Sequence, residues 1–275
     1  MRIFLAFILI LCSLLSYGQN KFDTSKEIGL SVGTSYYIGE INKSHFGGRL
    51  NVGGGMFFRN NFNRRWGLKF AVQYGKIEAF DEDSDVAWKQ NRNLQFQNSI
   101  LEGSAQVELN YKDYQVGSKE DFWTPYLFIG LGYYSMNPKA DYKGTLYELQ
   151  PLGTEGQGTT EGDERYSLSG MSIPFGVGFK VNVYGIIALN LEWGMRRTFT
   201  DYLDDVSTNY ANPAVLEDEN GVISALLADR SLQQEGALGD NTGVKRGDPG
   251  IKDMYSFVNF TIAIRIDKKP TSCWK

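Results

Sequence analysis

Eight segments of the chain alternate apolar and polar residues over about a dozen positions each. In the clearest segment, residues 99–111, Leu101, Val107 and Leu109 fall on one face, with Glu102 and Glu108 on the other. Successive side chains of a β-strand point to opposite faces, so this pattern predicts strands with one apolar face. Strands of about 9 to 11 tilted residues span a bilayer. The predicted strands are residues 26–38, 49–59, 66–76, 99–111, 125–135, 172–182, 187–197 and 254–266.

The connections between these strands alternate in length. Those after the second, fourth and sixth strands, near residues 60–65, 112–123 and 183–186, are shorter than the others. Those after the third, fifth and seventh cover residues 77–98, 136–171 and 198–253. Short periplasmic turns and long outer loops are typical of outer-membrane barrels. The pattern therefore predicts an all-β fold, an eight-stranded antiparallel transmembrane β-barrel with long extracellular loops and both termini in the periplasm.

A secreted β-sandwich or lipocalin-like barrel also has alternating strands and is the alternative fold. Aromatic residues near the predicted strand ends favour the membrane barrel, because aromatic girdles sit at both membrane interfaces. These residues are Tyr36, Tyr37, Trp66, Tyr74, Tyr111, Tyr133, Tyr134, Trp193 and Tyr255.

The first 18 residues have the pattern of a secretory signal peptide. Arg2 precedes an apolar run that ends before Ser16 and Gly18, the small residues that signal peptidase reads. We expect residues 1–18 to be removed and residues 19–275 to form the barrel with a short periplasmic C-terminal tail. Cys12 follows Leu11, where a lipobox needs a small residue, so lipidation is not expected. No later apolar run has the length of a spanning helix.

Charge and cysteine content narrow the partners. The formal net charge is −4 without a basic block, which makes nucleic acid an unfavourable partner. The mean hydropathy of −0.32 suits a barrel, whose apolar residues occupy every second strand position. Cys273 is the only cysteine of the mature chain, so it has either an intermolecular partner or an inert free thiol.

Candidate chemistry is sparse. His45, the only histidine, follows Ser44, and Asp201, Asp204 or Asp205 would orient it in a rim-site enzyme. No local motif fixes that geometry, so we expect no catalytic residues. The same aspartates do not have EF-hand spacing, and we interpret them as solvated loop charges, with no metal or cofactor expected.

Glycine groups and strand charges fit a narrow barrel. Residues 53–55, 130–132 and 176–178 lie within predicted strands with no following helix, so they are not phosphate-binding loops but sites of close packing. Side chains fill the interior of an eight-stranded barrel. We expect a polar network in the lumen and no conducting pore. Its predicted members are Lys69, Glu102, Glu108, Arg196 and Arg265.

Several segments resemble the PorG-like outer-membrane barrels of the type IX secretion apparatus. They are residues 35–42, 90–94, 137–140, 149–158, 197–207, 228–231 and 245–247, with the sequence TDYLDDVST at 200–208 the most specific. The chain has Glu40 where that family commonly has Asp, and Trp274 instead of proline after the C-terminal cysteine. The resemblance implies a non-enzymatic role alongside a periplasmic ring of a PorK/GldK-like lipoprotein and a PorN/GldN-like protein. The alternatives are an adhesin-type surface-binding barrel and, less favoured, the rim-site enzyme.

The C-terminal tail is the predicted contact with that ring. Lys268 and Lys269 provide positive charge and Trp274 an apolar anchor, the kind of residue that dominates interface energetics. Cys273 allows a disulfide to the ring lipoprotein if the two Cα atoms come within about 7 Å. Outer-membrane lipids are the remaining expected partner.

Overall fold

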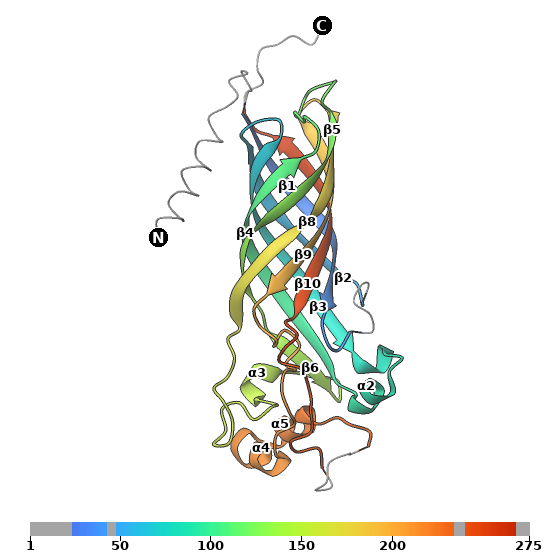
Figure 1. The fold of residues 1–275 in the computed structure, drawn as a ribbon, viewed down its shortest axis with the longest axis vertical. Coiled ribbons are helices and arrows are strands. Elements are labelled where there is room, and N and C mark those ends of the chain that lie inside the picture. Colours follow the sequence, from blue (N-terminus) through green and yellow to red (C-terminus); the bar gives the residue numbers. More distant parts are fainter. Residues whose placement is uncertain (1–23, 43–47, 234–239, 268–275) are drawn as a thin grey trace.

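The computed structural model describes residues 24–42, 48–233 and 240–267 and forms one closed β-barrel (Figure 1). Eight long strands pair antiparallel in the order β3-β2-β1-β10-β9-β8-β5-β4, and pairing of β3 with β4 closes the sheet. The predicted fold class is confirmed. The barrel strands are β1 (Ser25–Ile38), β2 (Asn51–Asn61), β3 (Trp66–Phe80), β4 (Gln95–Asn110), β5 (Trp123–Ser135), β8 (Ser169–Tyr184), β9 (Ile187–Thr198) and β10 (Met254–Arg265).

The strand predictions differ from the structure mainly at one end. β3 and β4 both continue past the predicted ends, and their pairing reaches Phe80 opposite Gln95. Ile77 and Phe96 in this extension are buried beneath the outer loops. The folded loops explain why β3 and β4 are longer than predicted. They bury side chains of the two strands beyond the predicted ends, so pairing continues there.

The long connections fold into a cap at one end of the barrel, opposite the end where β1 begins and β10 stops (Figure 1). The connection after β3 contains η1 (Asp81–Asp83) and α2 (Ala87–Arg92), and the one after β5 contains β6 (Pro138–Tyr142), β7 (Thr145–Glu148) and α3 (Leu149–Leu152). The connection after β9 contains α4 (Pro213–Asn220) and α5 (Val222–Ala228). We call the two ends the cap end and the turn end.

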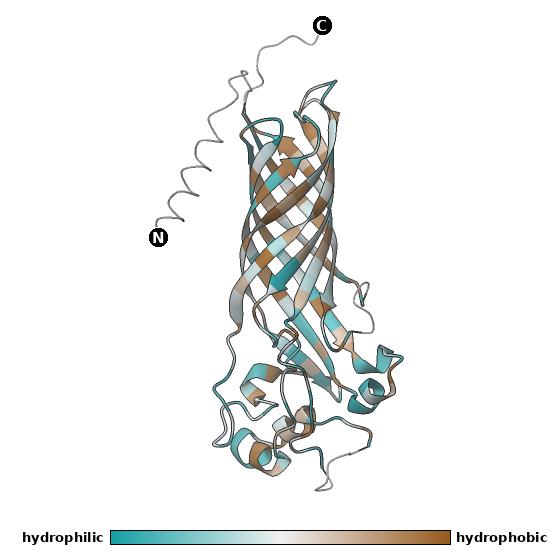
Figure 2. Cartoon of the chain, viewed as in Figure 1, coloured by the Kyte–Doolittle hydropathy of each residue, from teal (hydrophilic) through white to brown (hydrophobic). Residues whose placement is uncertain are grey.

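Apolar side chains cover the outside of the barrel wall. Figure 2 shows hydrophobic and hydrophilic residues mixed along the barrel strands, as alternation requires. Leu30, Val52 and Leu131 are each more than 60% exposed, whereas the alternate polar positions face inward. Trp66 and Tyr74 stand about half-exposed on β3, eight residues or roughly 26 Å of strand apart. That spacing matches an apolar band with aromatic borders, the exterior of a membrane-spanning barrel.

Four predicted girdle residues are buried and not in an exposed girdle. One of them, Tyr36, lies on the outward face of β1, where its hydroxyl accepts from Trp193 Nε1 at 3.0 Å. Tyr37, Tyr134 and Tyr255 are buried inside the barrel near the cap end. Tyr134 and Tyr255 pack edge to face with ring centroids 5.9 Å apart. Nearness to a strand end does not distinguish the two faces of a strand, and Tyr37, Tyr134 and Tyr255 occupy the inward one.

Glycines allow the narrow lumen to fill, as predicted. A Cβ atom at Gly178 would lie 2.4 Å from the ring of Tyr126, and one at Gly176 would lie 2.9 Å from Phe128. Both aromatic rings therefore lie against bare backbone on β8.

Several predictions fall outside the described residues: the signal peptide at 1–18, His45, and the tail residues Lys268, Lys269, Cys273 and Trp274. Across residues 24–42, 48–233 and 240–267, no helix combines the length and apolarity needed to cross a membrane.

Candidate functional site

Charged side chains fill the lumen at the turn end. Arg59 Nη2 donates to Glu108 Oε1 at 3.2 Å, and Lys180 Nζ donates to Glu108 Oε2 at 2.5 Å. Lys69 Nζ donates to Glu192 Oε2 at 2.5 Å. The charges balance, with three cations and three carboxylates in ion pairs among buried residues. The set is Glu27, Arg59, Lys69, Glu108, Lys180 and Glu192.

A second, smaller group fills the lumen nearer the cap. Arg196 Nε donates to Glu102 Oε1 at 3.3 Å, and its Nη2 donates to Gln73 Oε1 at 2.5 Å. Tyr255 donates to the other oxygen of Glu102 at 2.7 Å. Beyond this group, aromatic and aliphatic side chains continue without interruption into the cap. They include Tyr37, Ile77, Phe96, Ile100, Tyr134 and Phe257.

In the described residues, paired charges and aromatic rings occupy the lumen. A cavity between the charged residues of the lumen has a volume of about 10 Å³. About one water molecule needs that much space. Little space for water therefore remains between these charged side chains.

Four of the five predicted lumen residues are confirmed: Lys69, Glu102, Glu108 and Arg196. Arg265 is the exception. It lies at the turn end, pairs with Asp267 at 2.9 Å and donates to the Val116 carbonyl oxygen. Its place near the end of the last strand puts it below the network.

Arg246 joins the three long connections of the cap. Its Nη1 donates to Glu155 Oε1 at 2.9 Å and its Nε to the Ala228 carbonyl oxygen at 3.0 Å. Its own carbonyl accepts from Arg92 Nη1 at 2.7 Å. Arg92 in turn forms a two-point ion pair with buried Asp81. Two buried guanidinium groups, those of Arg246 and Arg92, thus tie the connections after β3, β5 and β9 to one another.

Two carboxyl groups meet at the hydroxyl of Tyr37. Tyr37 Oη lies 2.5 Å from Asp204 Oδ2 and 2.6 Å from Asp253 Oδ1. Burial and the charge of Asp253 raise the pKa of Asp204 well above its usual value, and burial does the same to the pKa of Asp253. A tyrosine hydroxyl has one proton, so both contacts are hydrogen bonds only when one carboxyl is protonated. The site therefore holds a proton in the cap.

The neighbouring aspartates are buried as well, which corrects their interpretation as solvated loop charges. Asp205 is fully buried, accepts from Thr154 and Tyr166, and has its pKa raised to about 6 by burial. Burial also raises the pKa of Asp201 to about 6. Asp205 adopts a left-handed φ of 67°, uncommon for a residue other than glycine. The TDYLDDVST segment is therefore the interior of the cap and not its surface.

His45, on which the catalytic arrangement depends, lies outside the described residues, so that arrangement stays untested. Asp204 and Asp205 are occupied by Tyr37, Thr154 and Tyr166. Among residues 24–42, 48–233 and 240–267, no three His, Cys, Asp or Glu side chains are placed to hold a metal ion.

Sequence reasoning missed Arg246, Glu155 and Asp253 as cap residues. The resemblance included Arg246 and Glu155 within longer segments, but spacing gave no indication that they pair across 91 positions. Asp253 lies 50 positions from Leu203, and its Oδ2 accepts a hydrogen bond from the Leu203 backbone N–H. Contacts this distant in sequence depend on the closed barrel, which brings the loops together.

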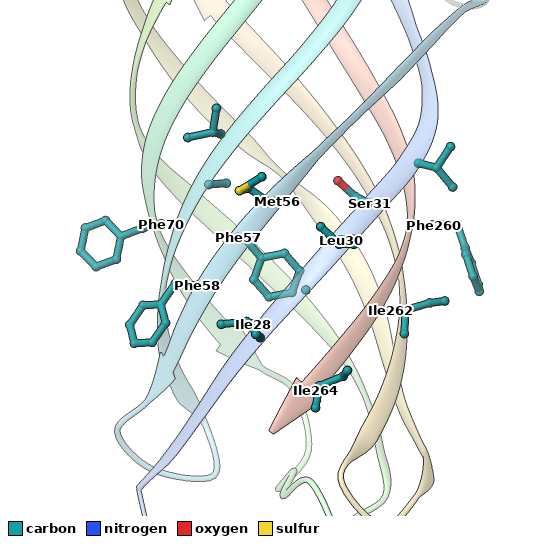
Figure 3. Close-up of a pocket in the computed structure, with 14 residues that line it drawn as sticks. Ile28, Leu30, Ser31, Met56, Phe57, Phe58, Phe70, Phe260, Ile262 and Ile264 are labelled. Carbon is teal, nitrogen blue, oxygen red and sulfur yellow. The ribbon is translucent and has the colours of Figure 1, made fainter. Parts of the chain in front are cut away.

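An apolar groove lies on the outside of the wall, with a volume of about 770 Å³ (Figure 3). Figure 3 shows Phe58, Phe70 and Phe260 pointing away from the barrel. These side chains belong to the lipid-facing surface, so the groove is part of the bilayer contact.

The family model described as "Domain of unknown function (DUF6089)" matches residues 1–220. No curated protein sequence matches the chain. Three solved barrels are similar in structure. Neisserial surface protein A shares 9% identity with a TM-score of 0.42, covering 89% of this chain and 99% of that one. The outer membrane protein OprG from Pseudomonas aeruginosa has 9% identity, a TM-score of 0.41 and the same coverages. The attachment invasion locus protein Ail of Yersinia pestis has 10% identity and a TM-score of 0.37, covering 90% and 100%.

Proposed function

This chain belongs to the family described as "Domain of unknown function (DUF6089)", and from that premise we propose that it is a non-enzymatic outer-membrane component of the type IX protein secretion machinery. In this proposal it anchors or accompanies a periplasmic ring of PorK/GldK-like and PorN/GldN-like proteins. The cap faces outward, and the turn end faces the periplasm.

The sealed lumen is the observation that carries the anchoring role. Six paired charges and an aromatic plug occupy the space through which an exported chain would pass. A barrel of this kind serves a secretion machine by fixing other components to the membrane.

The position of the chain ends also supports the proposal. The last described residue, Asp267, accepts from the Lys26 backbone at the turn end, 3.1 Å away. A tail that begins there starts on the side where the ring is proposed to lie. Lys268, Lys269, Cys273 and Trp274 remain the proposed contact residues.

Deletion of the gene tests the role. In the deletion strain we expect cargo with the C-terminal sorting signal to accumulate in the periplasm. In a separate experiment, we expect the affinity-tagged protein to co-purify with both ring proteins. Full cargo export without the barrel contradicts the proposal.

A Cys273→Ser variant tests the covalent contact. On non-reducing gels the wild type should migrate as a heavier species that contains the ring lipoprotein, disappears on reduction and is missing in the variant. A freely alkylatable Cys273 in purified outer membranes means that any ring contact is non-covalent.

A surface-binding barrel is the second candidate, favoured by apolar side chains exposed on the cap. Trp88, Phe199 and Leu232 are each more than half exposed. This candidate predicts that deletion reduces attachment while cargo export continues. The rim-enzyme candidate depends on His45, and unchanged secretion in a His45→Ala strain removes it.

A further inference from the structure

A pocket of about 710 Å³ lies where the cap meets the barrel wall, between α2 and the segment 245–254. Its lining includes Ile38, the last residue of β1, and Met254, the first residue of β10, which are paired across the two strands. Ile38 shares the alternation face of lipid-facing Leu30, and Met254 shares that of Phe260. On this face Ile38 is buried and Met254 is half-buried, so one side of the pocket is apolar and lies next to the end of the lipid-facing band.

The other side of the pocket is cationic. Five cations and two carboxylates line it, an excess of three positive charges (5 − 2). They are Lys89, Arg92, Lys245, Arg246 and Lys252, against Glu40 and Asp248. Protein partners already engage three of the cations: Arg92 pairs with Asp81, Arg246 with Glu155, and Lys245 with Asp248.

Lys89 and Lys252 are different. Lys89 Nζ donates to the Glu40 and Asn42 carbonyl oxygens, and Lys252 Nζ donates to the Pro249 carbonyl oxygen at 2.8 Å. Within the described ranges neither lysine forms an ion pair. Each ammonium group has three donors, so both retain hydrogen-bonding capacity for an anion. Burial raises the pKa of Glu40, one of the two carboxylates that line the pocket.

We propose that this pocket binds the phosphate of an anionic lipid in the leaflet around the cap end. The phosphate contacts Lys89 and Lys252, and the acyl portion lies along Met254 and Ile251. The site goes beyond the secretion role and does not depend on it.

The apolar lining favours a lipid over a free phosphate. Trp88 and Ile251 are each more than half exposed at this pocket. A small water-soluble anion would contact the lysines and leave these side chains in water. A lipid would contact both the lysines and the apolar side chains, because its charged group is joined directly to its acyl chains. The cationic and apolar residues of the pocket are adjacent in the same way.

Native mass spectrometry of the full-length protein in detergent tests the site with three probes: bisphosphorylated lipid A, phosphatidylcholine and inorganic pyrophosphate. The variant is Lys89→Gln with Lys252→Gln, and Lys119→Gln with Lys143→Gln is the control with the same charge change. We expect the wild type and the control to bind lipid A, and the pocket variant to bind it at least about tenfold more weakly. Heat-dependent gel mobility verifies that each variant is folded. If the pocket variant does not fold, Lys252→Glu, a single change at an exposed position, takes its place.

Four outcomes overturn the proposal. Equal lipid A binding by wild type and pocket variant places the lipid elsewhere. Equal affinity for phosphatidylcholine removes the phosphate-lysine contact as the determinant, and equal affinity for pyrophosphate removes the lipid. A lipid-independent dimer abolished by the lysine changes assigns the pocket to a second copy of the chain.

Discussion

At the scale of single residues, the lumen depends on charges that neutralise one another out of water. Glu108 is fully buried and lies within ion-pair distance of Arg59, Lys69 and Lys180. Taking charges out of water is costly, and the pairing repays that cost only while all partners are present. The turn-end network therefore holds strands β2, β3, β4 and β8 in a single register.

A Glu108→Ala substitution is expected to destabilise the barrel by about 3–5 kcal/mol, because it leaves buried cations without their shared carboxylate. Urea unfolding in detergent, followed by heat-dependent gel mobility, measures the loss. Glu120→Ala, at an exposed position in the β4–β5 turn, is the control and should leave the unfolding midpoint unchanged. Equal midpoints for the two variants contradict the structural role of Glu108.

The cap should weaken as pH rises. The pKa values of Asp201 and Asp205 are raised to about 6, and that of Asp204 is raised well above its usual value. The folded cap therefore binds more protons than the unfolded one, and stability falls from about pH 4 through pH 6 and above. Hydrogen exchange of residues 200–208, corrected for intrinsic rates, should show more opening at pH 7.5 than at pH 5.

An Asp204→Asn variant should reduce the slope of that pH dependence, because an amide does not ionise, while Asp201 and Asp205 keep their raised pKa values and their share of the slope. Asp218→Asn, at an exposed position of α4, is the matched control and should keep the wild-type profile. A profile as steep in Asp204→Asn as in the wild type assigns the pH dependence to other groups.

At the scale of elements, alternation predicted the barrel strands because each strand has one face in lipid and one in a polar lumen. It did not predict β6, β7 or the short helices. These elements form the cap, where no lipid on one side imposes an alternation of apolar and polar residues. The prediction of solvated aspartates was wrong for the same reason: loop position suggests exposure, but these loops fold on one another. Pairs such as Asp204 and Asp253 carry no local signal in the sequence.

Arg246 is expected to control cap integrity independently of the barrel. An Arg246→Met variant leaves buried Glu155 without its guanidinium partner, at a cost of about 3–5 kcal/mol. Limited proteolysis should then cut within residues 199–253, while heat-dependent gel mobility shows an intact barrel. Arg165→Met, at an exposed cap position, is the control and should resist the protease like the wild type. Simultaneous loss of barrel and cap would show that the two unfold as one unit.

The turns and the cap are expected on opposite sides of the membrane. An epitope inserted after Glu120 should be hidden in intact cells, whereas one inserted after Gly221, between α4 and α5, should be accessible to antibody. Both positions are exposed, so the insertions leave the barrel wall and its pairing intact. Permeabilised cells provide the control, because both tags should then be labelled. Labelling of the Glu120 tag alone in intact cells reverses the topology.

At the scale of the whole molecule, the barrel combines a lipid-facing exterior with an interior that side chains fill from the turn end into the cap. Charges seal the half nearest the turns and aromatic rings seal the half nearest the cap. We therefore expect the purified protein to produce no steady current when it is reconstituted in planar bilayers, because buried ion pairs and aromatic rings occupy its lumen. An open porin in the same bilayers verifies that insertion is detectable, and liposome flotation verifies that this protein has inserted. Reproducible single-channel steps that scale with protein concentration would contradict the sealed lumen, and with it the argument that the barrel anchors a secretion machine without conducting its cargo.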